Sequence, residues 1–148
     1  MTTFDKGTPV TVLDNRNAAA GAVLPRVAVL LAAYNGMAYI REQVESILAQ
    51  DGVDVTIFFS VDRSTDGTER WVGELAGRDR RAVLLPYGER FGGAARNFFH
   101  LVKEVDFSNF DFVSLADQDD VWLPEKLRHA IDVMRQQQAD AYSGNVLA

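Results

Sequence analysis

Three carboxylates crowd into the segment ADQDDVWLP, which covers residues 116–124. Asp117, Asp119 and Asp120 directly follow the apolar run FDFVSLA, so we expect them at the end of a buried strand. Carboxylates this close together repel one another when all are ionised. In an extended segment Asp117 and Asp119 point the same way, and oxygen ligands of this kind suit Mg²⁺ or Mn²⁺. The cluster therefore predicts a divalent-cation site with positions left for phosphate oxygens.

Each of these residues also has a simpler interpretation. Acidic loop clusters are more often solvated turns or helix caps than metal sites, and Asp120 is the member that fits this interpretation best. Asp66 is better explained as a helix cap than as a ligand. Trp122 can stack on a sugar, but a Trp before a helix is at least as often a packing residue. His100 and His129 fall on amphipathic helices, where structural or solvated roles are favoured over catalysis.

Composition narrows the class of protein. With 148 residues the chain has the length of one domain, and its net charge of −6 argues against broad attraction to nucleic acid or an anionic membrane. The absence of cysteine excludes disulfides, thiolate metal sites and a Cys nucleophile, and it fits a reducing cytoplasm. The longest apolar stretch, VAVLLAAY, is far too short to span a bilayer. Twelve Arg against three Lys favour planar contacts with phosphate or carboxylate.

Strand-like and helix-like segments alternate after residue 25. Apolar runs predict strands over 27–33, 53–61, 82–85 and 110–116, with a fifth beginning over 141–147. Apolar residues at helical spacing predict helices over about 40–50, around 71–75, over 98–105 and over 124–134. Residues 1–25 are expected to form a lead-in segment that is partly disordered or loosely packed. The alternation predicts an α/β domain over 26–148, with a mostly parallel, Rossmann-like sheet and flanking helices.

Polar residues follow three of these strands. In parallel sheets ligands bind beyond the carboxyl ends of the strands. At the second of these ends, Asp62 can accept a hydrogen bond from a ring N–H of a uracil- or thymine-type base. Arg63, Arg90 and Arg96 are expected on loops that reach a diphosphate, and the segment FGGAARN can cradle phosphate at a helix N-terminus. The strand ends together predict a site for a metal-bound nucleoside diphosphate.

Four segments resemble, in order, the motifs of family 2 glycosyltransferases with the GT-A fold: VAVLLAAYNGMAYIREQVESILAQ, VDRSTDGT, ERFGGAARNFFHLV and LADQDDVWLPEKL. The match runs from about Val27 to the C-terminus. The ADQDDVW and AYNG segments are most similar to rhamnosyltransferases of bacterial surface polysaccharide synthesis. This resemblance implies an inverting, metal-dependent transfer of a sugar, rhamnose in that group, to a saccharide or lipid-linked saccharide hydroxyl. It also implies a dTDP- or UDP-linked donor, Mg²⁺ or Mn²⁺, and a cytoplasmic location, with peripheral attachment at the inner membrane face as a further option.

The resemblance also assigns residues. Its substrate-binding positions are matched here by Ala33, Tyr34, Asp62, Arg96, Asp117 and Gln118. Ala33 and Tyr34 would contact the nucleoside, Asp62 the base, and Arg96 would lie near the diphosphate. Asp117 and Asp119 would form the D-x-D element, with Asp119 the better candidate for direct metal ligation. The chain departs from the family at the second loop, where Val61 replaces the first of two acids and Arg63 replaces a Gly.

Family members continue beyond this length, with acceptor-binding elements and an acidic general base. The chain is therefore expected to be an N-terminal donor-binding half, and no general base can be identified in it. The resemblance implies a glycosyltransferase of the hexosyltransferase type, and this chain alone is expected to be inactive. The alternative is a non-catalytic module that binds a nucleotide sugar to sequester or sense it. A phosphatase that uses a D-x-D is set aside, because there the motif follows the first strand, whereas VAVLLAAYNG carries no acid.

Overall fold

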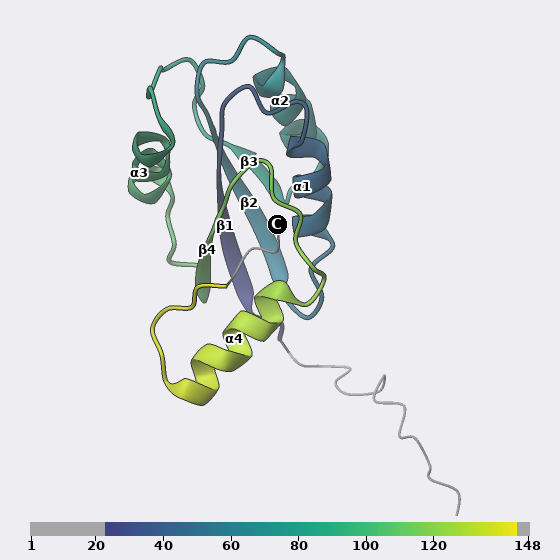
Figure 1. Ribbon diagram of the computed structural model, residues 1–148, viewed down its shortest axis with the longest axis vertical. Coiled ribbons are helices and arrows are strands. Elements are labelled where there is room, and N and C mark those ends of the chain that lie inside the picture. The colour runs from purple at the N-terminus through teal and green to yellow at the C-terminus, as the bar shows by residue number, and fades with distance from the viewer. Residues whose placement is uncertain (1–22, 145–148) are drawn as a thin grey trace, which may run out of the picture.

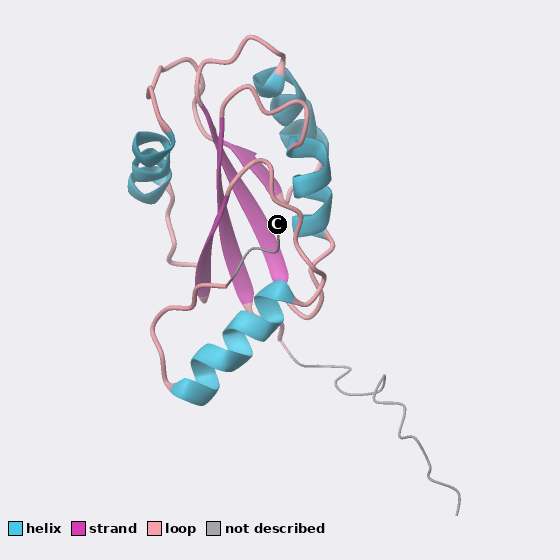
Figure 2. Ribbon diagram, viewed as in Figure 1, coloured by secondary structure: helices cyan, strands magenta, loops and turns pink. Residues whose placement is uncertain are grey.

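The computed structural model describes residues 23–144, in which four parallel strands form one sheet flanked by helices (Figures 1 and 2). The strands are β1 (Arg26–Ala33), β2 (Asp54–Val61), β3 (Ala82–Leu84) and β4 (Phe112–Ala116). The helices are α1 (Ile40–Leu48), α2 (Thr68–Arg78), α3 (Ala94–Glu104) and α4 (Lys126–Gln137). The sheet order is β3-β2-β1-β4. The predicted α/β class with a parallel sheet is confirmed.

Strand β1 is apolar on both faces because it lies between two other strands and between two layers of helices. Its register places Val29 beside Ile57 of β2, and Leu30 beside Leu115 of β4. Val29 and its alternate neighbours join the larger core, whereas Leu30 and Ala32 join a smaller one on the opposite face. A strand buried on both faces reads as a continuous apolar run, as this segment does.

The two faces of the sheet are covered unequally. Helices α1, α2 and α4 pack on one face, where they bury the residues Ile40, Val44, Ile47, Val72, Leu75, Leu127 and Ile131. On the other face α3 packs alone, through Leu101 and Val105. Figure 1 shows α3 on one side of the sheet and α1 with α2 on the other. None of the helices in the described part of the chain is long and apolar enough to span a membrane.

Several predicted boundaries change in the structure. Helix α4 begins at Lys126 and not at Pro124, because the Lys126 amide first closes a turn onto the Leu123 carbonyl. Strand β4 begins at Phe112 and not at Phe110, and the Asp111 side chain before it accepts the Arg26 amide. Of the predicted fifth strand, residues 141–144 are irregular and the remainder lies outside the described residues. The described strand pairings include no partner for 141–144. Residues 1–22 of the lead-in segment also lie outside the described residues.

Candidate functional site

A cavity of about 580 Å³ opens at the carboxyl ends of β1, β2 and β4. Its walls include seven of the residues singled out from sequence: Ala33, Tyr34, Asp62, Arg90, Asp117, Gln118 and Asp119. The remaining wall comes from the loop before α3 and from the first turns of that helix, including Gly92, Gly93 and Asn97. The volume lies within the range of roughly 300–1,000 Å³ that is usual for small-molecule sites. The predicted convergence of three strand ends is thus seen in space.

The turn after β1 is fixed by side chains from the loop after β2. Asn35 has a φ of 46°, a left-handed conformation that Asn tolerates better than most residues. Its amide donates to Ser64 Oγ at 3.0 Å, and its own Oδ1 accepts the Thr65 amide at 2.8 Å. The next amide, that of Gly36, donates to Thr68 Oγ1 at 2.9 Å. Backbone donors that a tight turn would otherwise leave unpaired are therefore satisfied.

Asp66 precedes Gly67, the N-cap residue of α2, and its side chain binds the first amide of the helix, in keeping with the capping role that its sequence position suggested. Its Oδ1 accepts the Thr68 amide at 3.0 Å, and its Oδ2 accepts the Met37 amide at 2.9 Å. Partial burial raises the pKa of Asp66, but hydrogen bonds from the Thr68 hydroxyl and from the Met37 and Thr68 amides outweigh this effect, so the net pKa is lowered. The carboxylate therefore joins the two loops that border the cavity and remains ionised.

Gln118 joins the ends of β1 and β4. Its Oε1 accepts the Tyr34 amide at 2.8 Å, and its Nε2 donates to the Tyr34 carbonyl at 2.9 Å. The approach is close, because a Cβ on Gly36 would lie 2.5 Å from Gln118 Oε1. The carboxamide thus binds the backbone of the first strand end and positions it beside Asp117 and Asp119.

Asp62 binds the backbone of the loop that precedes α3. It is 5% exposed, and its Oδ1 accepts the amides of Arg63 at 2.8 Å and Phe91 at 3.0 Å. Its Oδ2 accepts the Gly92 amide at 2.9 Å. Arg63, which follows it, donates from Nη2 to the Gly88 carbonyl of the same loop at 3.1 Å. An ionised carboxylate has about four acceptor positions, so one on Oδ2 is left for a ligand.

Sequence reasoning named the segment FGGAARN but gave no separate role to its last residue, Asn97, which is 3% exposed and lines the cavity. Its Nδ2 donates to the carbonyl of Ser60 at 3.0 Å and to that of Ala33 at 3.4 Å, so α3 is tied to the ends of β1 and β2. Among the described residues its Oδ1 has no hydrogen-bond partner. The signal was its spacing: Asn97 precedes Leu101 and Val105 at four-residue intervals on the buried side of α3.

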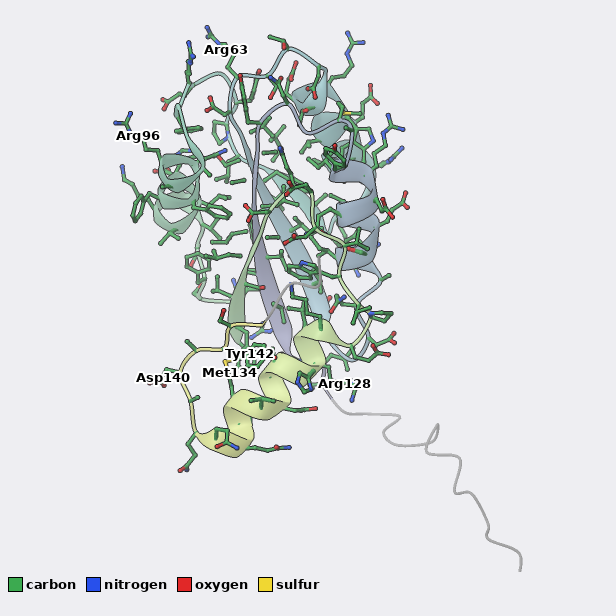
Figure 3. The ribbon with its side chains drawn as sticks, in the orientation of Figure 1. Arg63, Arg96, Arg128, Met134, Asp140 and Tyr142 are labelled. Carbon is green, nitrogen blue, oxygen red and sulfur yellow. The ribbon has the colours of Figure 1, made fainter. Side chains whose placement is uncertain are left out.

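Three arginines were expected to reach the diphosphate, and one of them lines the cavity. This residue is Arg90, whereas Arg96 does not line the cavity. Arg96 lies in the first turn of α3 and is exposed, and Figure 3 shows its side chain directed away from the sheet. The sequence placed Arg96 on a loop; because α3 begins at Ala94, the helix carries this side chain to the outside.

Asp117, Asp119 and Asp120 form a cluster of carboxylates, and the nearby charge of Lys126 acts on Asp120. Burial, followed by the charges of Asp120 and Asp119, raises the pKa of Asp117. None of the ion pairs found between described residues includes the three carboxylates. The described residues also contain no cluster of three or more His, Cys, Asp or Glu able to hold a metal by themselves. The donor set therefore fits a hard cation such as Mg²⁺ or Mn²⁺ that takes one or two carboxylates and completes its shell with phosphate oxygens and water.

Trp122 is a packing residue, which is the simpler of the two roles considered for it from the sequence. It is 4% exposed within the larger core, and Lys126 Nζ lies 4.1 Å from the centre of its ring. Burial lowers the pKa of Lys126, an effect opposed by the nearby charge of Asp120. His100 lies beside Phe91, with the ring centroids 4.8 Å apart, and lines no wall of the strand-end cavity.

Comparison with known proteins gives the family and the fold that the sequence motifs predicted. The family model described as "Glycosyl transferase family 2" matches residues 28–148. The dTDP-rhamnosyl transferase RfbG of Shigella flexneri is 42% identical over 119 residues, which are 80% of this chain and 41% of that protein. S. aureus TarS residues 1–349 in complex with UDP superpose with a TM-score of 0.63 at 21% identity, over 83% of this chain and 38% of that one. The mannosyltransferase PcManGT from Pyrobaculum calidifontis, in complex with GDP-Man and Mn²⁺, gives a TM-score of 0.63 at 24% identity, over 76% and 33%.

These solved structures share the fold, and at such identities the likeness extends no further than the fold. The chain spans about two fifths of the length of its Shigella relative and a similar share of the TarS chain. The family match, over residues 28–148, covers β1 from Ala28 onward, all of β2, β3 and β4, and every residue that lines the strand-end cavity.

Proposed function

Because the chain belongs to glycosyl transferase family 2, we propose that it binds a nucleotide-diphosphate sugar and forms the donor-binding part of a glycosyltransferase. The transfer is metal-dependent and inverting, and it moves rhamnose from a dTDP- or UDP-linked donor to a hydroxyl of a saccharide or lipid-linked saccharide. The observation that carries the proposal is the cavity in which the ends of β1, β2 and β4 meet. The similarity to a dTDP-rhamnosyl transferase supports the choice of sugar and base.

The proposed roles follow the contacts of the cavity. Ala33 and Tyr34 contact the nucleoside, and the remaining acceptor position of Asp62 takes the ring N–H of thymine or uracil. Asn97 Oδ1, a buried acceptor that receives no hydrogen bond from the residues the structure describes, suits a ligand hydroxyl. Arg90 lies at the cavity and replaces Arg96 as the arginine proposed to meet the diphosphate.

Asp117 and Asp119 are the proposed metal ligands, with Asp119 in direct contact. A bound divalent cation would supply positive charge to the diphosphate as it leaves. The protein's own part is to hold both carboxylates beside the nucleoside wall, and Gln118 does this through its two hydrogen bonds to the Tyr34 backbone.

A non-catalytic nucleotide-sugar-binding module is the second candidate, and the carboxylates of the cavity favour it. Asp62 already accepts three amides, while Asp117 and Asp119 are assigned to the cation. Within the described part of the chain, this leaves no cavity carboxylate to act as a general base for the acceptor. Release of dTDP from dTDP-rhamnose on addition of saccharide acceptors would favour the enzyme, whereas binding without release would favour the module.

The test of the proposed site is calorimetric titration of dTDP, UDP and GDP, with and without Mn²⁺. The variant is Asp119→Asn, and the matched control is Asp140→Asn, an exposed Asp outside the cavity that is labelled in Figure 3. We expect dTDP binding that requires Mn²⁺, is lost in Asp119→Asn and is retained in Asp140→Asn. Metal-independent binding, or equal binding by Asp119→Asn, would contradict the proposed metal site.

A further inference from the structure

The loop between β3 and α3, residues 86–93, forms part of the wall of the strand-end cavity through Arg90, Gly92 and Gly93. It belongs to no helix or strand, and Figure 1 shows it at the end of the sheet where β2 also ends. Gly88 has a φ of 128° and Gly92 a φ of 72°, conformations that glycine adopts without the strain of a side chain. Such a loop needs contacts from its surroundings to hold Arg90 in one place.

One side of the loop is held by hydrogen bonds to the segment 62–64, which follows β2. The Asp62 carboxylate accepts two amides of the loop, and Arg63 donates to a loop carbonyl. The Ser64 amide donates to the Tyr87 hydroxyl at 3.2 Å. All four bonds lead to one short segment, and none of them connects the loop to the body of α3.

On the side of α3 the loop is held by a contact between rings. The Phe91 ring lies on the His100 imidazole, with the ring centroids 4.8 Å apart and an angle of 32° between the planes. This distance falls in the range of about 4.5–7 Å that is typical of aromatic pairs. Phe91 therefore has two anchors, because its amide donates to Asp62 and its ring packs on α3. Arg90 directly precedes Phe91, so holding Phe91 also restricts where Arg90 lies.

His100 supplies a ring to this contact and not a hydrogen bond. Its Nε2 is buried and has no hydrogen-bond partner among the described residues. A buried polar atom without a partner is unfavourable, so no polar interaction at that nitrogen accounts for the histidine. His100 also lines no wall of the strand-end cavity, which excludes direct contact with a ligand bound there. What remains is the stack on Phe91, and through it the position of the loop.

We infer that His100 is a positioning residue. Its ring holds Phe91, and thereby Arg90, beside the strand ends, so that the cavity selects a nucleoside diphosphate over the corresponding monophosphate. A guanidinium binds phosphate oxygens through paired N–H groups, and a diphosphate offers more of these oxygens. When the arginine is already in place, binding does not have to order the loop, and more of the interaction appears as affinity. The inference rests on the proposed function, because selection among nucleotides requires that the cavity binds them.

The experiment is calorimetric titration of dTDP and of dTMP in the presence of Mn²⁺. His100→Ala should lower the ratio of dTDP affinity to dTMP affinity by about fivefold, the effect of about 1 kcal/mol. Phe91→Ala removes the same contact from the loop side and should lower the ratio to the same extent. His100→Phe keeps a ring and removes the unpaired nitrogen, so it should keep the wild-type ratio. His129→Ala, at the other histidine, which is exposed on α4 outside the cavity, is the matched control.

A double variant separates positioning from general destabilisation. In an Arg90→Ala background, His100→Ala should leave the ratio of dTDP to dTMP affinity unchanged, because the arginine that the ring positions is absent. Hydrogen exchange in the ligand-free protein tests the contact without any nucleotide. His100→Ala should speed exchange of the Phe91 and Gly92 amides, whereas the Val105 amide at the end of α3 should exchange as in the wild type.

Several results would overturn the inference. Equal losses of dTDP and dTMP affinity in His100→Ala would show a purely structural residue. A loss in His100→Phe as large as in His100→Ala would assign the effect to the nitrogen and not to the ring. The same change of the ratio in the Arg90→Ala background would show that His100 does not act through Arg90.

The two kinds of measurement also separate this inference from the proposed function. If the wild type binds neither nucleotide, the proposed function fails and the selectivity assigned to His100 fails with it. If dTDP binds but exchange at Phe91 and Gly92 is the same in His100→Ala as in the wild type, the positioning contact is contradicted and the proposed function stands.

Discussion

At the scale of single residues, the carboxamide of Gln118 and the carboxylate of Asp62 bind backbone groups on neighbouring segments. Gln118 pairs with both backbone groups of Tyr34, and Asp62 accepts three amides. A net contribution of about 0.5–1.5 kcal/mol for each hydrogen bond is typical. Both side chains therefore shape the cavity before any ligand arrives, which lowers the ordering cost of binding.

The contact between Gly36 and Gln118 yields the first prediction. Gly36→Ala should displace Gln118, since the new Cβ would lie 2.5 Å from Oε1, and should weaken dTDP binding by about tenfold through the loss of one or two hydrogen bonds. In a Gln118→Ala background the same change should cost little, because the obstructing atom is gone. Calorimetry on the two single variants and the double variant measures this coupling. Additive losses would contradict the assigned contact.

Asp62 yields a prediction about the base. Uracil carries a ring N–H where cytosine carries a bare ring nitrogen, so wild-type protein should prefer UDP to CDP. Asp62→Asn should weaken binding of both, because the amides of Phe91 and Gly92 lose an ionised acceptor. The preference for UDP should also disappear, since the amide of Asn can donate to cytosine. A variant that binds weakly but keeps the full preference would show that Asp62 only holds the loop.

The sequence predicted which residues line the cavity where this depends on their position at the end of a strand. Asp62, Asp117 and Asp119 follow apolar runs, and parallel strands bring their carboxyl ends together. Gln118 and Tyr34 lie 84 positions apart, and a side chain of the first binds the backbone of the second. Such a contact produces no periodic pattern in the sequence, so it was not predicted. Arg96 does not line the cavity because α3 already begins at Ala94, so Arg96 lies on the helix and not on the loop before it.

At the scale of elements, the connection from α2 to β3 is closed by an ion pair. The Arg81 guanidinium donates from Nη2 to Asp79 Oδ2 at 2.8 Å, and from Nε to Oδ1 at 3.1 Å. Hydrogen bonds from the Arg81 side chain and then its amide lower the pKa of Asp79 to about 2, from an ordinary value of 3.8. The same guanidinium donates from Nη1 to the Leu48 carbonyl at 3.3 Å. The segment between α2 and β3 is therefore also hydrogen-bonded to the end of α1.

Stability should therefore depend on pH through Asp79. A lowered pKa stabilises the fold fully above the unfolded value of 3.8, and that contribution is lost as the pH falls toward about 2. Asp79→Asn should reduce the free energy of unfolding by about 1 kcal/mol at pH 7, a magnitude limited by the partial exposure of the pair. Urea denaturation should show the difference from wild type shrinking between about pH 4 and pH 2. A difference that is constant with pH would contradict the ion pair as its source, and Asp140→Asn serves as the control.

The elements themselves were largely predictable, because long apolar runs and helical spacing are local signals. The run 27–33 identified a strand buried on both faces, and β1 is central among the described strands. The fifth strand was a weaker signal. Of residues 141–144 only Tyr142 is a strand-favouring type, and the described sheet places no strand beside them, whereas a strand needs a hydrogen-bonded partner.

At the scale of the whole molecule, the strand-end cavity and the larger core share the same strands. Ala33 and Val61 end β1 and β2, line or adjoin the cavity, and belong to the larger core. Binding at these ends should therefore stabilise the fold as a unit. The smaller core under α3 is joined to the same strand ends through Asn97, so both faces of the sheet are connected to the site.

Ligand should consequently shift global unfolding. With dTDP at one hundred times its dissociation constant and Mn²⁺ present, the free energy of unfolding should rise by about 2.7 kcal/mol. Urea denaturation followed by circular dichroism measures this rise, and Asp119→Asn should show none of it. Calorimetric binding without any shift of the urea midpoint would mean that the ligand binds away from the folded strand ends.

The central claim is that three strand ends form one metal-dependent nucleotide site, and paramagnetic broadening by Mn²⁺ tests it most directly. Mn²⁺ is added in small amounts to ¹⁵N-labelled protein saturated with dTDP. We predict that the amide signals of Tyr34, Gly92, Gln118 and Asp119 broaden first, whereas those of Arg78 and Glu104, at the far ends of α2 and α3, stay sharp. Sharp signals at the strand ends, or broadening centred on another acidic group, would contradict the account.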